Sequence, residues 1–311
     1  MHFIRAADTG GHSDFSTLWY GARMLINNEN PYLLIGPGRA VDLPSVPNYP
    51  APAFVAALPF APFPVHLAGT LFVFLSTGLL AFGCTRDSWH RLPLFPSIAF
   101  ATSAQLGQSS IFFTAAAFLP ALAAFALVKP QASIPVAASA VDRSTIIWAG
   151  MGSAILMIVS FALFPNWVSQ WTSVLRATDH FMPPIGRFGG PAIALVLLRW
   201  RRPEAWLVFL AACTPQTWYP YNSLILLLVA LTYREACVLS LLSSAGWIIA
   251  ALTSPSDTRS AETREIMGAM LVAACYLPAT IAVLRRGNDG VLPFWIRWLL
   301  RQEAHGYRPA R

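Results

Sequence analysis

Charged residues are scarce in this sequence of 311 residues. Asp, Glu, Lys and Arg make up only 11% of it, whereas soluble domains carry about 25%. Hydrophobic residues make up 56%, more than a water-soluble chain of this length can bury. The scarcity of charge therefore excludes an ordinary soluble domain, and the mean hydropathy of +0.54 indicates an integral membrane protein.

Cysteine is also rare. The four cysteines, Cys84, Cys213, Cys237 and Cys275, each lie in or beside an apolar run, and no pair has the spacing of a metal-binding motif. We interpret them as small hydrophobic residues of helices. Clustered carboxylates at metal-binding spacing are also missing from the sequence, so we expect no metal site and no cofactor.

The sequence has no basic stripe interleaved with aromatic residues, although its net charge is +7. Nucleic acid is therefore not an expected partner. The basic residues lie in short clusters between apolar runs, where they set membrane topology. With the first fifty residues outside, most of the 21 basic residues face the cytoplasm, including those at 199–202 and 285–286. This orientation predicts a multi-pass protein of the cell membrane, with membrane lipids as neighbours.

The apolar runs are continuous rather than alternating, which favours helices over a membrane β-barrel. We expect an all-α fold with about nine transmembrane helices in a single membrane domain. Its parts are an extracytoplasmic amphipathic or re-entrant segment (1–63), a transmembrane bundle (64–284) and a cytoplasmic basic tail (285–311). The expected spans are 64–84, 92–104, 109–128, 144–164, 185–198, 204–214, 219–231, 236–252 and 266–284.

Three further segments are apolar but do not fit a full span. Residues 15–28 predict an amphipathic helix that ends before Asn30-Pro31. Residues 53–60 are too short to span, because about 20 residues are needed, and predict a re-entrant or interfacial helix. Residues 292–300 predict an amphipathic helix on the inner membrane surface.

A series of short motifs follows the expected outer loops. The first is Asp14-Phe15, then Trp19-Tyr20-Gly21-Ala22-Arg23 and Asn30-Pro31-Tyr32, which resembles the pattern DF…YYxAxxxLxxGxxPY. After it come Tyr49-Pro50-Ala51-Pro52, Gly107-Gln108, Lys129-Pro130-Gln131, Pro215-Gln216 and Tyr219-Pro220-Tyr221-Asn222. In this order, over residues 14–232, the chain resembles the bacterial polyprenyl-phosphate-sugar-dependent membrane glycosyltransferases of glycosyltransferase family 87.

That resemblance implies a C-type glycosyltransferase fold and a mannosyltransferase-like, inverting reaction. The donor is a hexose, mannose by resemblance, on a polyprenyl phosphate, and the acceptor is a lipid or a glycan. A carboxylate at the outer surface acts as general base on the acceptor hydroxyl. The matching motif assigns this role to Asp14. The alternative is that Asp14 caps the 15–28 helix, since Asp is a favoured N-cap.

Other residues of the outer face are candidates for substrate binding. Each has a plainer interpretation: interfacial anchor for Tyr32, Tyr49 and His66, solvated loop for His180 and Arg187, and helix end for Gln108. The full set of candidates is Arg23, Tyr32, Tyr49, His66, Gln108, Lys129, His180 and Arg187.

Two features depart from the family pattern. Only 21 residues separate Gln108 from Lys129, so a single span would place Lys129 inside, whereas two half-helices broken at Pro120 would return it outward. The family's first membrane helix is also not found in residues 1–14. We therefore keep two alternatives to the glycosyltransferase: a transporter or flippase, and an inactive, truncated paralogue.

Overall fold

The computed structural model describes residues 13–177, 182–253 and 260–300. Within these ranges the chain is helical and forms no β-strand, apart from a single bridge between Ile35 and Val41. The all-helical prediction is confirmed. The predictions for residues 1–12, for the C-terminal part of the basic tail (301–311) and for His180 fall outside the described residues.

Four helices within the described ranges are long and apolar enough to cross a membrane. They are α4 (Val65–Thr85), α8 (Arg143–Leu163), α11 (Tyr233–Thr253) and the rod Ala261–Leu284. The rod consists of α12 (Ala261–Leu271), a π-helical turn (Val272–Tyr276) and α13 (Leu277–Leu284). Large apolar side chains are exposed along α8, for example Ile155 at 58% and Ile158 at 69%, as expected of a helix that faces lipid.

The other apolar segments are shorter than a span. They are α5 (Ile98–Gln105), η5 (Gly190–Arg199), α10 (Pro203–Cys213) and η6 (Pro220–Val229). The 3-10 helix η6 is enclosed by protein, with every residue from Ser223 to Val229 buried. Two further short turns, η2 (Leu92–Leu94) and η4 (Pro184–Gly186), precede α5 and η5.

The expected span at 109–128 is wrong. The chain forms α6 (Ser110–Ala116), turns, and returns as the 3-10 helix η3 (Pro120–Val128) before α7 (Pro130–Ser139). Pro120 explains the break, because a residue before proline avoids helical angles. Leu119 has φ −123° and ψ 88°, which ends the first half-helix. The half-helix alternative is therefore the one that the structure adopts.

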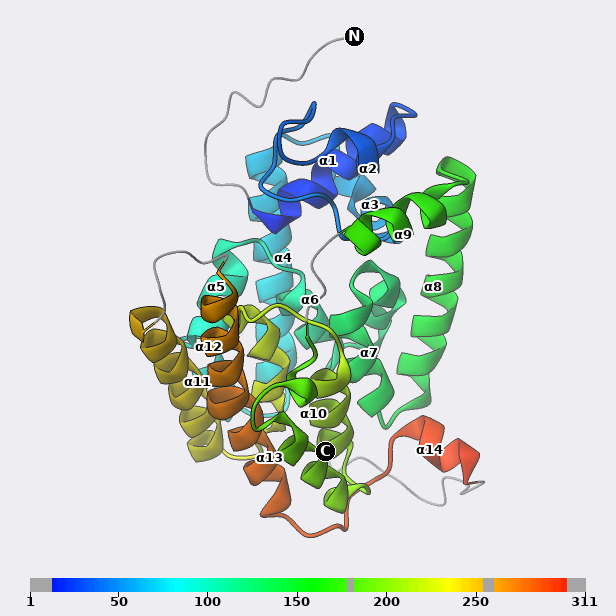
Figure 1. The fold of residues 1–311 in the computed structure, drawn as a ribbon. Helices are drawn as coiled ribbons and strands as arrows, with labels where there is room; N and C mark the ends of the chain where they lie inside the picture. The colour runs from blue at the N-terminus through cyan, green and yellow to red at the C-terminus, as the bar shows by residue number, and fades with distance from the viewer. Residues whose placement is uncertain (1–12, 178–181, 254–259, 301–311) are drawn as a thin grey trace.

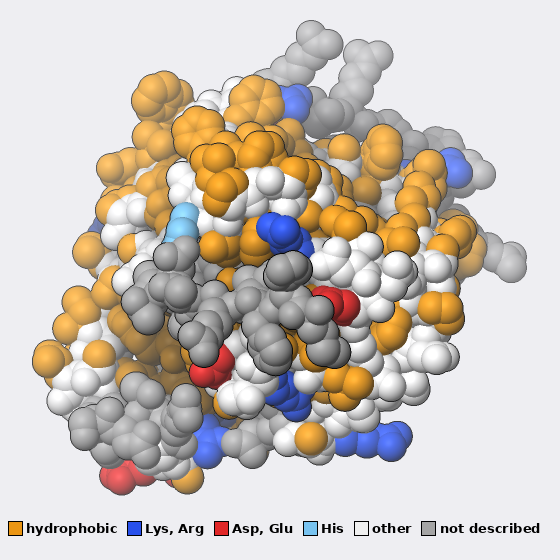
Figure 2. Space-filling view, turned by 90° about the horizontal axis from the view of Figure 1, so that it is seen from above, with side chains coloured by type: hydrophobic (Ala, Val, Ile, Leu, Met, Phe, Trp, Pro, Cys, Tyr) orange, Lys and Arg blue, Asp and Glu red, His pale blue; other side chains and the backbone are white. Residues whose placement is uncertain are grey.

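The N-terminal helices lie together at one end of the molecule, the upper end in Figure 1. They are α1 (Asp14–Ile26), α2 (Pro31–Leu34) and α3 (Ala51–Ala57), which continues as η1 (Leu58–Phe60), and α9 (Trp167–Ala177) lies beside them. Phe15, Tyr32 and Phe54 are fully buried in their core. Figure 2 looks onto this end and shows hydrophobic side chains across much of it, with charged side chains scattered among them.

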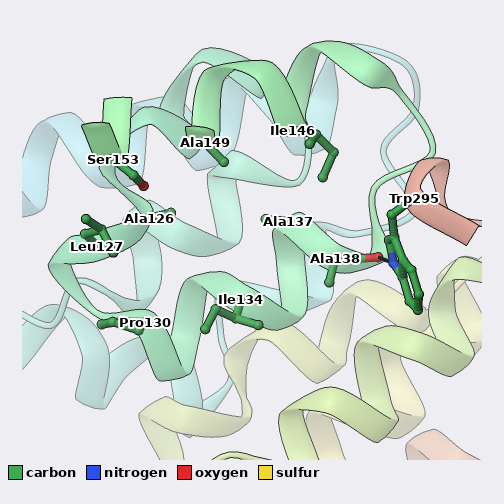
Figure 3. Close-up of a pocket in the computed structure, with 10 residues that line it drawn as sticks. All are labelled: Ala126, Leu127, Pro130, Ile134, Ala137, Ala138, Ile146, Ala149, Ser153 and Trp295. Carbon is green, nitrogen blue, oxygen red and sulfur yellow. Dashed lines mark hydrogen bonds between the residues drawn. The ribbon is translucent and has the colours of Figure 1, made fainter. Parts of the chain in front are cut away.

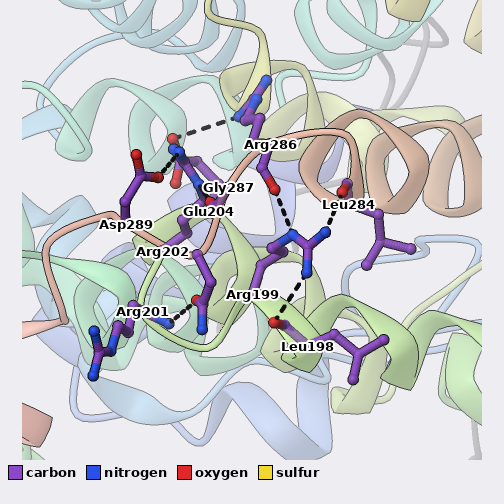
Figure 4. Close-up of polar contacts among 10 residues, drawn as sticks. Leu198, Arg199, Arg201, Arg202, Glu204, Leu284, Arg286, Gly287 and Asp289 are labelled. Atoms are coloured by element: carbon purple, nitrogen blue, oxygen red, sulfur yellow. Dashed lines mark hydrogen bonds and ion pairs between the residues drawn. The ribbon is translucent and has the colours of Figure 1, made fainter.

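Arginines gather at the opposite end, where they hold helix ends together (Figure 4). Arg199 donates to the carbonyl of Leu284 at 2.9 Å. Arg286 donates to the carbonyl of Val229 at 2.7 Å and pairs with Glu235 at 2.9 Å. The arginines at 199–202 and 285–286 therefore lie on one side, as the charge pattern requires.

A helix lies within the predicted segment 292–300, as α14 (Phe294–Leu299). The backbone N–H of Phe294 donates to Ala140 at 2.9 Å, and the Trp295 indole donates to the carbonyl of Ala138 at 2.7 Å. Trp298 is 70% exposed. α14 thus lies against the end of α7, with the aromatic side chain of Trp298 on the surface.

Candidate functional site

Asp14 is the first residue of α1, and its N-cap is Ser13. Asp14 is therefore not the N-cap, and that alternative is wrong. A carboxylate in the first turn still interacts favourably with the helix dipole. The carboxylate instead accepts a hydrogen bond from Nε2 of Gln108. The backbone N–H of Asp14 donates to the carbonyl of Leu106 at 2.8 Å, so both groups tie α1 to the 106–109 turn.

Gly107 makes this close approach possible. Its φ is +61°, a left-handed conformation that costs other residues energy. A Cβ at this position would lie 3.2 Å from Cβ of Phe15 and 3.3 Å from Cβ of Ser13. The Gly-Gln motif thus has a physical basis: the glycine lets α1 approach, and the next residue points its amide at Asp14.

Gln108 links Asp14 to Lys129. Its side chain is 1% exposed, and its Oε1 accepts a hydrogen bond from Nζ of Lys129 at 2.7 Å. Lys129 follows η3, is 4% exposed, and lies 5.0 Å from the centre of the Tyr221 ring. The half-helix turn therefore returns Lys129 to the end of the molecule that carries Asp14.

The two charged groups shift each other's protonation. Burial raises the pKa of Asp14, and the Lys129 ammonium opposes this effect. Burial lowers the pKa of Lys129 to about 8, and the Asp14 carboxylate opposes it. A carboxylate of raised pKa next to a buried cation is suited to accept a proton while the cation faces an anion.

Tyr49 adds a phenol to this site. Burial raises its pKa well above the usual value, and Asp14 and then Tyr221 add to the effect, so both groups are close to it. Tyr32 is buried and donates its hydroxyl to the carbonyl of Tyr49 at 3.0 Å. Tyr32 thus holds the loop that carries Tyr49 and does not reach Asp14 itself.

The structure does not bring Arg23, His66 or Arg187 into this cluster. Arg23 is exposed near the other end of α1, about 14 Å from Asp14 along the helix, and lies over Trp19 at 4.9 Å. His66 is exposed on the first turn of α4. Arg187 lines a separate cavity near α12.

One residue of the site, Tyr221, was not among the candidates, and its ring lies beneath the Lys129 ammonium. It belongs to the motif Tyr219-Pro220-Tyr221-Asn222, so the sequence carried a signal for it. Gln216, from the motif Pro215-Gln216, is buried and donates to the carbonyl of Ala211 at 2.8 Å and to the hydroxyl of Tyr276 instead. The motif spacing did not reveal that η6 runs beside Lys129.

An apolar cavity of about 350 Å³ is lined by residues on both sides of Lys129 in the sequence, Leu127 and Pro130 (Figure 3). It runs between α7 and α8 and is closed at one end by Trp295, which lies at the opposite end of α7 from Lys129. Neither this cavity nor the one at Arg187 is lined by Asp14. The lining residues are Ala126, Leu127, Pro130, Ile134, Ala137, Ala138, Ile146, Ala149, Ser153 and Trp295.

Comparison of the chain with protein-family models, curated proteins and solved structures finds no match. Within the described ranges, no group of three or more His, Cys, Asp or Glu residues is placed to hold a metal ion.

Proposed function

We propose that the chain is an integral membrane glycosyltransferase that moves a hexose, mannose by resemblance, from a polyprenyl phosphate to a hydroxyl of a lipid or glycan acceptor. The supporting observation is the hydrogen-bonded series Asp14–Gln108–Lys129. Three motifs that are far apart in sequence meet in it. A carboxylate, an amide and a cation at one end of a helical bundle are the groups that this transfer requires.

The proposed reaction assigns one role to each charged group. Asp14 takes the proton of the acceptor hydroxyl while that oxygen forms a bond to the anomeric carbon of the donor sugar. The bond from this carbon to the phosphate oxygen breaks, and polyprenyl phosphate leaves with the electron pair. The Lys129 ammonium stabilises the charge that develops on the phosphate. Gln108 holds the two groups in a fixed relation.

The apolar cavity supports a lipid-linked donor. It is lined by Pro130, the neighbour of Lys129, and its other lining side chains are apolar apart from Ser153 and the indole nitrogen of Trp295. A phosphate held by Lys129 would leave its isoprenoid chain to enter this cavity and run along the exposed apolar side chains of α8. We assign the cavity to the first part of that chain.

The proposal includes the finer topology. About nine crossings, with α1 outside and α14 inside, would use the four long helices together with the shorter α5, α7, η5, α10 and η6. The paired half-helices at 110–128 return to the outer end, so they add no net crossing. We also propose the C-type arrangement that the motif order suggests.

The test uses purified protein in lipid nanodiscs with a synthetic polyprenyl-phosphate mannose and a mixture of lipid acceptors. Release of polyprenyl phosphate together with a glycosylated acceptor is the expected result. Movement of intact donor across liposome membranes, with no bond cleaved, would identify the transporter alternative instead. A folded protein that does neither would leave the paralogue alternative and overturn the proposal.

A further inference from the structure

A second cavity, of about 700 Å³, lies away from Asp14 at the end of α12 remote from Arg286. Its volume is in the range of small-molecule sites, about 300–1,000 Å³. The loop after η4, the loop before η6 and one face of α12 form its walls. The lining residues are Met182, Gly186, Arg187, Phe188, Trp218, Arg264, Glu265, Ile266 and Ala269.

Arg187 is held in place at this cavity rather than lying free on the surface. Its Nη1 donates to the carbonyl of Arg264 at 3.4 Å, and its guanidinium packs on Gly268, where any side chain would collide with it. Its Nε is buried and has no hydrogen-bond partner. A buried donor left unpaired costs about 1–3 kcal/mol, so an oxygen ligand at this point would be stabilising.

The charges of the cavity favour an anion. Among the described lining residues, Arg187 and Arg264 carry guanidinium groups and Glu265 a carboxylate. A guanidinium presents paired N–H groups that match the oxygens of phosphate. The chemistry of the lining thus selects a phosphate group rather than a neutral sugar.

Aromatic rings connect this cavity to the Asp14 site. Trp218, in the cavity wall, stacks on Tyr219 with ring centres 5.7 Å apart, and Tyr219 stacks on Tyr221 at 5.6 Å. Tyr221 in turn lies 5.0 Å from the Lys129 ammonium. Trp218 and Tyr219 are partly exposed, whereas Tyr221 is only 6% exposed, which leaves the first two rings, and not the third, open to a ligand.

We propose that the Arg187 cavity binds the phosphate of the acceptor, so that the acceptor is a phosphorylated glycolipid or sugar. The assignment rests on the proposed function, in which Lys129 takes the donor phosphate. Arg187 is then the cation left for the other substrate. It shares its cavity with Trp218, which is connected to Lys129 through Tyr219 and Tyr221. The acceptor would extend from Arg187 along Trp218 and Tyr219 toward the Lys129 site.

The test measures binding without any transfer, so it can be interpreted even if the chain is not a glycosyltransferase. Full-length protein is presented with inorganic phosphate, with glycerol 3-phosphate, and with nanodiscs of phosphatidylglycerol or phosphatidylcholine. Retained lipid is counted by native mass spectrometry, and the soluble ligands are tested as competitors. We expect retention of phosphatidylglycerol over phosphatidylcholine. If the soluble phosphates compete with the lipid, the acceptor is a soluble phosphorylated molecule. If they do not compete, the site binds a lipid headgroup.

Variants locate the binding. Arg187→Gln should weaken anion binding by roughly tenfold to a hundredfold, the loss expected for one charge-assisted contact. Arg187→Lys keeps the charge but not the paired N–H groups, so intermediate binding is expected from a folded protein. Arg176→Gln on α9, where the arginine is exposed, is the matched control and should bind as the unmodified chain does. Unchanged binding in folded Arg187→Gln, or equal retention of both lipids, would overturn the proposal.

Discussion

The Lys129 ammonium lies 2.7 Å from the side-chain oxygen of Gln108, which lies 21 residues earlier on the other side of a broken helix. One amide thus contacts a buried cation through its oxygen and the Asp14 carboxylate through its nitrogen. Five predictions follow from this arrangement and from the helix ends around it, each with its own measurement.

Asp14→Asn should lower transfer by about 10²–10⁴-fold, because the amide cannot take a proton from the acceptor. The new side chain still presents an oxygen to Gln108, so the melting temperature should stay near that of the unmodified chain. Initial rates and thermal unfolding of the same preparation check both points. A fully active, well-folded Asp14→Asn protein would remove Asp14 from the role of base.

Gln108→Leu should destabilise the protein by roughly 1.5–3 kcal/mol, since it removes hydrogen bonds to two charged groups. Gln131→Leu is the matched control, because Gln131 is exposed on the neighbouring α7. Thermal unfolding in detergent compares the two variants. Equal melting temperatures for them would show that the Gln108 amide does not hold Asp14 and Lys129 together.

Transfer should have a bell-shaped pH profile. Asp14 must be ionised, so activity should rise as the pH passes its raised pKa. Lys129 must be protonated, so activity should fall as the pH rises through about 8. Lys129→Arg should shift the alkaline limb to higher pH, since arginine stays protonated. An alkaline limb near pH 8 that persists in Lys129→Arg would assign it to another group.

Gly107→Ala should reduce both stability and transfer. Gly38→Ala is the control that separates the backbone cost of a positive φ from the steric contact with α1. Both glycines have positive φ, +61° and +67°, so both substitutions carry a backbone cost of about 1–2 kcal/mol. Only at Gly107 would the new Cβ meet Phe15 and Ser13. Gly107→Ala should therefore also lose transfer by displacing Asp14. Equal loss of transfer in the two variants would contradict the close approach of α1.

Reporter fusions after Arg202 and after Arg286 should both be cytoplasmic. The hydrogen bond from the Arg202 side chain to the Gly287 carbonyl requires the two positions to share a side, and the positive charge there favours the cytoplasm. A fusion after Arg176 should be extracytoplasmic, since α9 lies at the opposite end. Reporters at 202 and 286 on different sides would be incompatible with the fold.

The sequence predicted the helices whose signal is local. Residues 64–84 and 144–164 are continuous apolar runs with polar flanks, and α4 and α8 match them within one residue at each end. Residues 109–128 are equally apolar, but hydropathy does not report where a chain reverses. Pro120 was the visible signal, and only the packing of η3 against α8 decided that the chain turns there.

The sequence predicted which residue types form the candidate site, but not which of them lie in contact. Asp14, Gln108 and Lys129 came from three motifs, and their contact depends on the 117–119 turn and on Gly107. Tyr32 has the same kind of motif signal, yet it packs against Phe54 and Phe164 in the core. Nothing in the sequence separates an aromatic residue that supports a loop from one that faces a ligand.

The enclosed helix η6 constrains how the molecule is made. Its ten residues rise about 20 Å as a 3-10 helix, less than the hydrocarbon thickness of about 30 Å. Alone in lipid, such a segment would leave backbone groups unsatisfied at its ends. It therefore has to be enclosed by α5 and α6, which precede it in the chain, and by α11, which follows it. Insertion and folding of η6 are then one event. α11 must be synthesised before Tyr221, which lies beneath Lys129, reaches its final position.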